Sequence, residues 1–332
     1  MPTWKLSANA AFFGLQRDRY TEYHPAVSLE EKVARVARVP GITGIECKYP
    51  TDLEDVPRVQ RLLDAHNLTL SAVNVDTKDA AHYRYGALSA ADPAARRHAV
   101  ARLQAGMDVA AAMGVNLVTT CPLADGHEYP FQMDHLAAWG RMAESVREVA
   151  AHRPDVRLAL EYQPHDMQAR PMLANVGKLL HLLARVNLPN VGATLDIGHA
   201  IAAGETPAES IALLVQTNAL FYVHSNDNTG DGGDWDMVSG SVHFWQYLEA
   251  LYTLDRLGYD GWIGADIKCP LMDAVDAFAA NTLMLRRMMT LLDRLDAQRM
   301  ADLVAGEGNT RAVFGYLMDH LVPDENEGPM GR

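Results

Sequence analysis

Basic residues, cysteines and long apolar runs are scarce in this 332-residue chain. The 29 lysines and arginines stand against 42 aspartates and glutamates, which leaves a formal net charge of −13. Because binding to a phosphate backbone requires a basic surface, this charge argues against a nucleic-acid partner. No stretch approaches the roughly 18 apolar residues of a membrane-spanning helix, and the first residues lack a basic segment followed by an apolar run. We therefore expect a cytoplasmic protein with no membrane partner.

The three cysteines, Cys47, Cys121 and Cys269, are scattered and form no CxxC pair. This pattern excludes a disulfide framework, and we expect buried free thiols near strand ends. The chain also lacks a GxGxxG turn near its start. That absence argues against a dinucleotide-binding, doubly wound open sheet.

Short β-rich runs alternate with longer amphipathic segments along the chain, as in a parallel sheet with crossover helices. Several of these runs are continuously apolar, which is typical of strands buried on both faces. Eight such units within about 295 residues match a closed (β/α)8 TIM barrel in number and size. The predicted strands are residues 5–13, 42–48, 68–75, 115–121, 156–163, 191–197, 219–226 and 261–268.

Helix starts are also recognisable. Capping boxes are predicted at Ser28–Glu31 and at Thr51–Glu54. The pair Asp92–Pro93 predicts the start of a long helix, with an N-cap followed by proline in the first turn. Gly114 predicts its end, because glycine readily adopts the left-handed conformation that closes a helix.

The alternation stops after residue 296. We expect residues 1–296 to form the barrel and residues 297–332 to form a short C-terminal helical arm with a disordered tail. The arm could pack against a neighbouring subunit of a homodimer or homotetramer. It could equally fold back over its own barrel, and the sequence leaves both arrangements open.

Ionisable residues end the last four predicted strands, at the barrel face where active sites of this fold lie. They are Glu161, Asp196, His224 and Asp266, hereafter the strand group. Carboxylates at the ends of apolar strands are costly to bury without a cation, and converging carboxylates raise one another's pKa. We therefore predict a divalent metal. Mixed carboxylate and imidazole ligands suit Mn²⁺, Co²⁺ or Mg²⁺, with Zn²⁺ as an alternative.

A second set of ligands, hereafter the loop group, consists of His199, Asp234 and Asp236. His199 follows Asp196 by three residues, and the two aspartates are two residues apart. In an extended segment that spacing directs both side chains the same way. Alone, the segment GDGGDWD would indicate a solvated turn. Beside Asp196 it predicts a second metal site, with Asp196 bridging the two.

Together these motifs resemble the xylose isomerase-like barrels, most closely their rhamnose-isomerase-like branch. That family has an acidic ligand on strand five, acid-x-x-His on strand six, and Asp-x-Lys on strand eight. Its strand-seven ligand is followed ten and twelve residues later by two aspartates. The corresponding segments here are Glu161, Asp196-Ile-Gly-His199, His224, Asp234-Trp-Asp236 and Asp266-Ile-Lys268. The resemblance covers most of residues 40–290.

The resemblance implies an aldose–ketose isomerase with two divalent metals, acting on a free monosaccharide. One metal, on the strand group, would hold two substrate oxygens, and the other, on the loop group and Asp196, would polarise the carbonyl. Lys268 would donate a hydrogen bond to the developing oxyanion. Glu161 and Asp266 complete the predicted catalytic residues.

The chain departs from the family pattern at three positions. Lys48 stands where xylose-converting members have a ring-opening histidine, and Gln163 stands where they have the lysine of Glu-x-Lys. His224 replaces an aspartate, as in the rhamnose-isomerase-like branch and the ketose 3-epimerases. Xylose is therefore not the expected substrate.

Contacts to the sugar are expected from a set of apolar and polar residues near the strand ends. These are Phe13, Lys48, Asn74, Gln163, Asn226 and Trp235.

Three other functions are known alternatives for a barrel with such residues. A ketose 3-epimerase uses two glutamates as acid and base, whereas the strand-eight partner here is the shorter Asp266. An apurinic-site endonuclease would need histidines on earlier strands, and strands two and three end without any. A barrel that binds a sugar without turnover is the non-enzymatic alternative.

Overall fold

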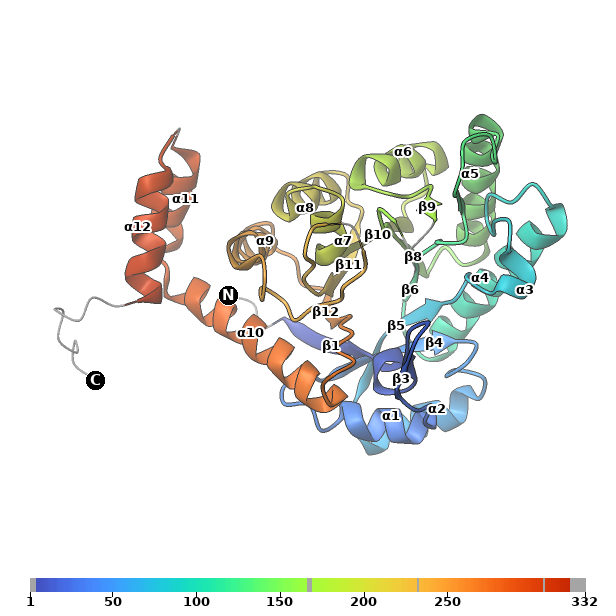
Figure 1. The fold of residues 1–332 in the computed structure, drawn as a ribbon, viewed down its shortest axis with the longest axis horizontal. Helices are drawn as coiled ribbons and strands as arrows, with labels where there is room; N and C mark the ends of the chain where they lie inside the picture. The colour runs from blue at the N-terminus through green and yellow to red at the C-terminus, as the bar shows by residue number, and fades with distance from the viewer. Residues whose placement is uncertain (1–3, 166–168, 232, 307, 323–332) are drawn as a thin grey trace.

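Eight parallel strands close into a barrel in the computed structural model, which describes residues 4–165, 169–231, 233–306 and 308–322 (Figure 1). The predicted (β/α)8 TIM barrel is therefore confirmed. The barrel strands are β1 (Lys5–Asn9), β4 (Gly44–Tyr49), β5 (Thr69–Val75), β6 (Leu117–Thr120), β8 (Arg157–Glu161), β10 (Val191–Asp196), β11 (Leu220–Ser225) and β12 (Trp262–Ala265).

Each barrel strand pairs with its neighbours in chain order, and β1 pairs with β12 to close the ring, with Lys5 opposite Trp262. Strands covered on both faces should be apolar throughout. In β10, every residue from Val191 to Asp196 is buried. A carboxylate at the end of so apolar a strand has little water to stabilise it.

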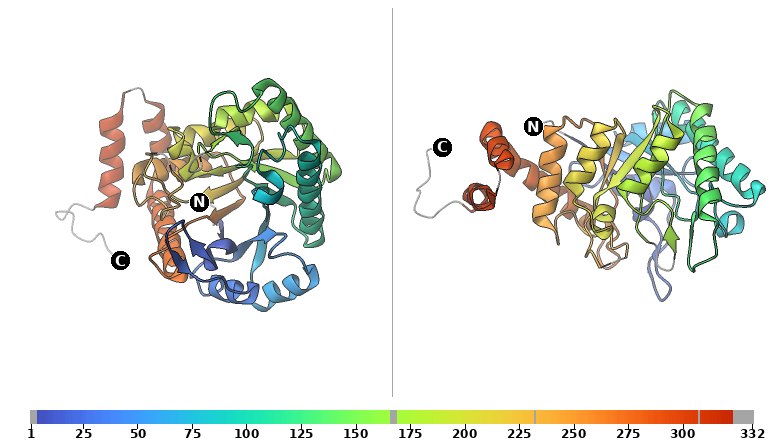
Figure 2. Two further views of the ribbon diagram at one scale, coloured as in Figure 1. Left: turned by 45° about the vertical axis from the view of Figure 1, so that its right-hand side comes forward. Right: turned by 90° about the horizontal axis from the view of Figure 1, so that it is seen from above.

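Helices surround the strands, as the left view of Figure 2 shows most clearly. The long ones are α1 (Leu29–Val36), α2 (Val56–Ala65), α4 (Pro93–Ala112), α5 (His135–His152), α6 (Val176–Val186), α8 (Pro207–Gln216), α9 (Phe244–Arg256) and α10 (Ala274–Arg294). Short elements occupy the loops: η1 (Ala10–Phe13), α3 (Ala80–Tyr83), α7 (Ile197–Ala202), and the strand pairs β2 (Gln16–Arg17) with β3 (Glu22–His24) and β7 (Gly126–His127) with β9 (Arg170–Pro171). No helix in the described ranges is long and apolar enough to cross a membrane.

Two of the three predicted helix starts are confirmed. The Ser28 hydroxyl accepts a hydrogen bond from the Glu31 backbone N–H at 3.3 Å, and Asp92 caps α4 in the same way. The start predicted at Thr51–Glu54 is wrong. That segment forms turns, in which the Asp52 N–H donates to the Lys48 carbonyl at 2.7 Å, and α2 begins only after Asp55.

The predicted first strand, residues 5–13, is too long. The strand ends at Asn9, whose side chain accepts a hydrogen bond from the Ala11 N–H at 3.0 Å. This cap turns the chain into the 3₁₀ helix η1. The apolar run of residues 10–13 therefore lies over the end of the barrel, because a local side-chain hydrogen bond competes with strand extension.

The helices that follow the barrel, α11 (Ala297–Ala305) and α12 (Thr310–Leu321), lie beside one another at the end of α10 (Figure 1). The rings of Trp245 on α9 and Phe314 on α12 are 5.0 Å apart. Met300 and Leu317 are buried in the core that the barrel helices share. The described part of the arm thus packs on its own barrel, whereas the predicted disordered tail, residues 323–332, lies outside the described residues.

Candidate metal centre and substrate pocket

The strand group lies at one end of the barrel because each member stands at or next to the C-terminal end of its strand. Glu161 ends β8, Asp196 ends β10, His224 is the next-to-last residue of β11, and Asp266 directly follows β12. Strand register pairs Asp196 with His224. The parallel arrangement therefore brings together four side chains that lie up to about a hundred residues apart along the chain.

Within the strand group, one ligand atom of each residue lies within 4.8 Å of the others. His224 Nδ1 is 3.0 Å from Asp266 Oδ2 and 3.4 Å from Glu161 Oε1. It lies 4.0 Å from Asp196 Oδ2. Glu161, Asp196 and His224 are buried. These atoms surround one point, as the ligands of a single cation would.

The loop group meets the same spacing, with its three ligand atoms within 4.8 Å of one another. His199, on the short helix α7, places Nε2 3.1 Å from Asp234 Oδ1. Asp236 is buried and has a left-handed backbone, with φ of 47°. The segment is therefore not extended as the sequence suggested. The two aspartates nevertheless converge, because the loop itself turns toward His199.

The two groups adjoin each other through His199 and Asp196. His199 Nδ1 is 3.2 Å from Glu161 Oε1 and 3.9 Å from Asp196 Oδ1. Asp196 is thus near the imidazoles of both groups, since its other oxygen faces His224. Glu161 Oε1 lies nearer to both imidazoles, at 3.2 Å from His199 Nδ1 and 3.4 Å from His224 Nδ1, so the bridging role of Asp196 stays a prediction.

The glycine of the motif Asp196-Ile-Gly-His199 is required by packing. A side chain on Gly198 would collide with the Asn226 Oδ1. Asn226 is buried and donates a hydrogen bond to Asp196 Oδ2 at 2.6 Å. This predicted sugar contact therefore holds a carboxylate in place.

The imidazoles compensate only some of the acidic residues. Burial opposes this compensation, but His224 and His199 lower the pKa of Glu161, and His199 lowers that of Asp234. Burial raises the pKa of Asp196 to about 7, with a further contribution from Glu161. Burial also raises the pKa of Asp236 well above its ordinary value, and nearby Asp234 adds to this. Carboxylates held this way are stabilised by a cation.

Both groups fit divalent metals in donor chemistry as well as in spacing. Carboxylate oxygens and imidazole nitrogens are ligands of Mn²⁺, Mg²⁺, Co²⁺ and Zn²⁺. His199 Nδ1 is buried and has no hydrogen-bond partner among the described residues. An imidazole nitrogen of this kind, surrounded by carboxylates, is available to a cation.

The carboxylate of Glu46, to which the sequence analysis assigned no role, contacts the imidazole of His224 on its Nε2 side. Glu46 Oε2 lies 2.9 Å from His224 Nε2, and both side chains are buried. The Asn74 amide donates to Glu46 Oε1 at 2.7 Å. With Nε2 occupied, the imidazole turns Nδ1 toward the other members of the strand group. Metal-bound histidines commonly have such a carboxylate partner.

A pocket of about 210 Å³ opens onto both groups. It contains the predicted sugar contacts Lys48, Asn74 and Gln163, together with Glu161, His199, Asp234, Asp236 and Asp266. Its other lining residues are Asn9, Ala11, Phe12, Lys78 and Cys121. They come from loops and strand ends in the first half of the barrel, where isolated polar residues carry no motif.

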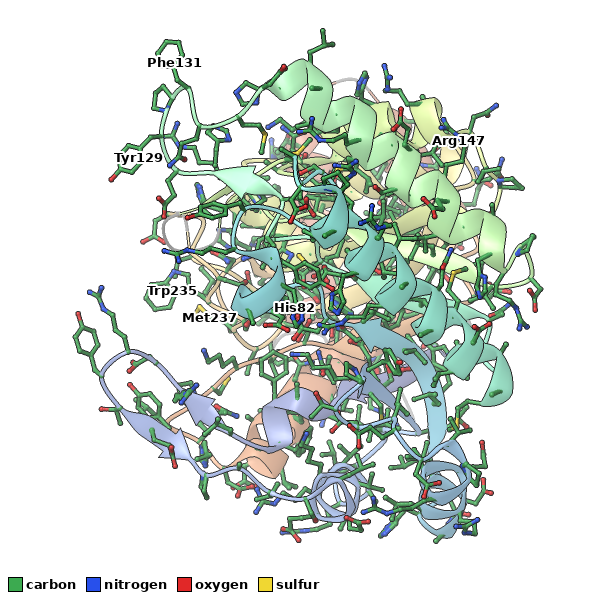
Figure 3. All side chains as sticks on the ribbon, turned by 90° about the vertical axis from the view of Figure 1, so that its right-hand side faces the viewer. His82, Tyr129, Phe131, Arg147, Trp235 and Met237 are labelled. Carbon is green, nitrogen blue, oxygen red and sulfur yellow. The ribbon has the colours of Figure 1, made fainter. Side chains whose placement is uncertain are left out.

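Two predicted aromatic contacts do not line this pocket. Phe13 is fully buried and packs against Phe278, with ring centroids 4.4 Å apart. Phe12 lines the pocket in its place, because the turn at Asn9 reverses which side chain faces it. Trp235 is half exposed and lies at the edge of the molecule, on the same side as Tyr129 and Phe131 (Figure 3).

Lys268 is also absent from the pocket lining. Its charge acts on Asp18, whose pKa is lowered mainly by backbone hydrogen bonds from Tyr20 and Thr21 and to a smaller extent by Lys268. In the described ranges no ion pair joins Lys268 to Asp266. Its predicted role at the reacting oxygen is therefore not supported by its position.

Comparison with known proteins gives a consistent result. The family described as the xylose isomerase-like TIM barrel matches residues 33–288. The structure of L-ribulose 3-epimerase is similar, with 16% identity and a TM-score of 0.66 over 92% of this chain and 99% of that one. A xylose isomerase domain protein from Alicyclobacillus acidocaldarius subsp. acidocaldarius has 18% identity and a TM-score of 0.65, over 86% and 98%.

D-Allulose 3-epimerase from Methylomonas sp., solved in complex with D-allulose, is also similar. It has 18% identity and a TM-score of 0.61 over 86% of this chain and 98% of that one. At these identities the structures establish the shared fold. The family match confirms the resemblance that the sequence motifs predicted.

Proposed function

Because the chain belongs to the xylose isomerase-like TIM barrel family, we propose that it is a divalent-metal-dependent aldose–ketose isomerase acting on a free monosaccharide. The observation that carries this proposal is the loop group, His199, Asp234 and Asp236, beside the strand group. Two adjacent cation sites suit a reaction that must hold two neighbouring sugar oxygens while charge develops on one of them.

The reaction converts a C1 aldehyde and C2 alcohol into a C1 alcohol and C2 ketone. The hydrogen on C2 moves to C1, and the proton of the O2 hydroxyl is transferred to O1, so that atoms and charge balance. When bound, the metals supply positive charge that orients the two oxygens and stabilises negative charge on the carbonyl oxygen.

The side chains of the pocket contribute position and proton transfer. Glu161 and Asp266, two members of the strand group that line the pocket, hold the sugar in place from one side. A carboxylate oxygen of the loop group, which also lines the pocket, accepts the O2 proton. Asn74 and Gln163, which also line the pocket, limit the orientations that the sugar can adopt.

A ketose 3-epimerase is the second candidate. It is favoured by the strand group, in which His224 stands with Glu161 and Asp266. In this alternative Glu161 and Asp266 would remove and return the C3 proton, and the loop group would only bind hydroxyls.

A panel of free aldoses and ketoses, incubated with Mn²⁺-loaded protein in heavy water, tests the proposal. NMR is expected to show interconversion between C1 and C2 for at least one sugar. Inversion and deuterium incorporation at C3 would instead identify an epimerase. Sugar binding with no conversion of any panel member would contradict both enzymatic functions.

A further inference from the structure

Lys78 contributes a cation to the pocket that neither metal group supplies. It follows β5 and lines the pocket together with Lys48. Lys48 is neutralised, because its Nζ lies 2.7 Å from Asp76 Oδ2. Lys78 has no ion-pair partner in the part of the chain that the structure describes. Lys78 is exposed as a whole residue, and part of it lines the pocket.

Lys78 lines the same pocket as Glu161 and Asp266 of the strand group. Desolvation of the ammonium inside the pocket would by itself lower its pKa. The pKa is instead raised above its ordinary value by nearby acidic groups, first Cys121 and then Glu161. Since Glu161 belongs to the strand group, the Lys78 ammonium lies within electrostatic reach of the metal-binding carboxylates. It stays protonated and can only donate hydrogen bonds.

Two other residues that could have supplied this cation do not. Gln163, where the family pattern has the lysine of Glu-x-Lys, is uncharged. Its Nε2 donates to the His165 carbonyl at 3.1 Å, and its Oε1 lies 3.6 Å from the Cys121 sulfur. Lys268 lies outside the pocket lining. Lys78 lines the same pocket as Gln163 and Cys121, which contact each other.

We propose that Lys78 is a catalytic residue that donates a charge-assisted hydrogen bond to the sugar oxygen on which negative charge develops as hydrogen moves between C1 and C2. This inference rests on the proposed isomerase function. Such a donor matters more in the transition state than in the bound substrate, because its partner becomes an anion only there. Removing an oxyanion donor lowers kcat by about 10²–10³-fold.

Substitution kinetics test the role directly. Lys78→Met is expected to lower kcat by roughly 10²-fold or more with little change in KM. Lys78→Arg should recover part of the loss, because arginine retains the charge and the donors. The matched control is Lys178→Met, which removes an exposed lysine on α6. Circular dichroism and bound Mn²⁺ content should be equal in all variants.

Several outcomes would overturn this role. They include full kcat in Lys78→Met, an equal loss in Lys178→Met, or a loss in Lys78→Met that arises only through KM. A collapse of kcat in Lys268→Met with normal kcat in Lys78→Met would assign the donor to Lys268 instead.

A second measurement does not depend on turnover. The protein is labelled with ¹⁵N-lysine and loaded with diamagnetic Mg²⁺, and the NMR signal of the Lys78 ammonium is assigned by its loss in Lys78→Met. A change in this signal, but not in that of Lys178, on addition of at least one sugar of the panel supports the inference. An unchanged Lys78 signal with every sugar overturns it. A changed signal without conversion of any sugar would contradict the isomerase reaction while leaving Lys78 as a sugar-binding residue.

Discussion

Glu46 holds the imidazole of His224 from the side opposite the other members of the strand group. The Glu46 Oε2 and His224 Nε2 are 2.9 Å apart, and both side chains are buried. Glu46 is itself fixed by the amide of Asn74. The orientation of a residue at the end of β11 thus depends on β4 and β5, which lie on the other side of the barrel.

This relationship predicts that Glu46→Gln weakens metal binding without removing a ligand. Loss of the charge makes His224 a poorer donor and allows its ring to reorient, so the Mn²⁺ affinity should fall by about 10–100-fold. Isothermal titration calorimetry measures the change. Glu54→Gln, at an exposed turn position, is the control and should leave the affinity unaltered. An unchanged affinity in Glu46→Gln would show that this support is unimportant.

The bridging role predicted for Asp196 has a consequence for metal stoichiometry. Asp196→Asn should abolish Mn²⁺ binding at both sites together with activity, because its oxygens face His199 and His224. Asp234→Asn, which changes the loop group alone, should lose one metal and retain the other. Elemental analysis after gel filtration distinguishes the two results. Full metal content in Asp196→Asn would disprove the bridge.

Metal removal should destabilise the fold, because the clustered carboxylates then repel one another. A ligand that binds only the native state stabilises it by about 2.7 kcal/mol per site at a free concentration of 100 times Kd. Urea unfolding with Mn²⁺ and with EDTA should show a difference of this size for each site. Asp196→Asn should show almost none, and an equal Mn²⁺ effect in that variant would place the bound metal elsewhere.

Substitution of Asp125 should lower the stability of the fold, because this residue fixes the loop that contains Ala87, Leu88 and Ser89. Its buried carboxylate accepts hydrogen bonds from the backbone N–H groups of Ala87, Leu88 and Ser89, and from the Ser89 hydroxyl. An asparagine would direct an N–H toward one of these donors. Asp125→Asn should therefore cost about 1–3 kcal/mol of unfolding free energy.

Urea denaturation at constant metal concentration measures this loss. The exposed Asp319→Asn on α12 is the control and should change stability by less than about 0.5 kcal/mol. Equal stability of Asp125→Asn and the unaltered protein would mean that the loop reorganises at no cost.

Local patterns in the sequence were sufficient for the barrel and for the residues of both metal groups. Largely apolar runs such as residues 191–195 specify buried strands, because only a sheet covered on both faces can bury them fully. In a parallel barrel, residues that end successive strands must meet at one face. Glu161, Asp196, His224 and Asp266 could therefore be placed together without coordinates.

Strand and helix boundaries were less predictable where side chains compete with the backbone for hydrogen bonds. Asn9 stops β1 by capping η1, and this exchanges Phe13 for Phe12 at the pocket. Asp55, rather than Thr51, starts α2 after a turn. The positions of these boundaries depend on short-range hydrogen bonds from side chains to the backbone. Such bonds differ little in strength between one possible boundary and the next.

What the sequence by itself determined is the barrel and the meeting of the strand-end side chains that could hold a metal, since strand periodicity and the motif Asp196-Ile-Gly-His199 are local. Only the tertiary structure decided which residues face those ligands across the pocket. Glu46 and Lys78 lie on or after strands in the first half of the barrel, and no spacing connects them to His224 or Glu161. Their roles arise because barrel closure brings distant strand ends together. The number of residues between two strand ends does not predict how close those ends are in space.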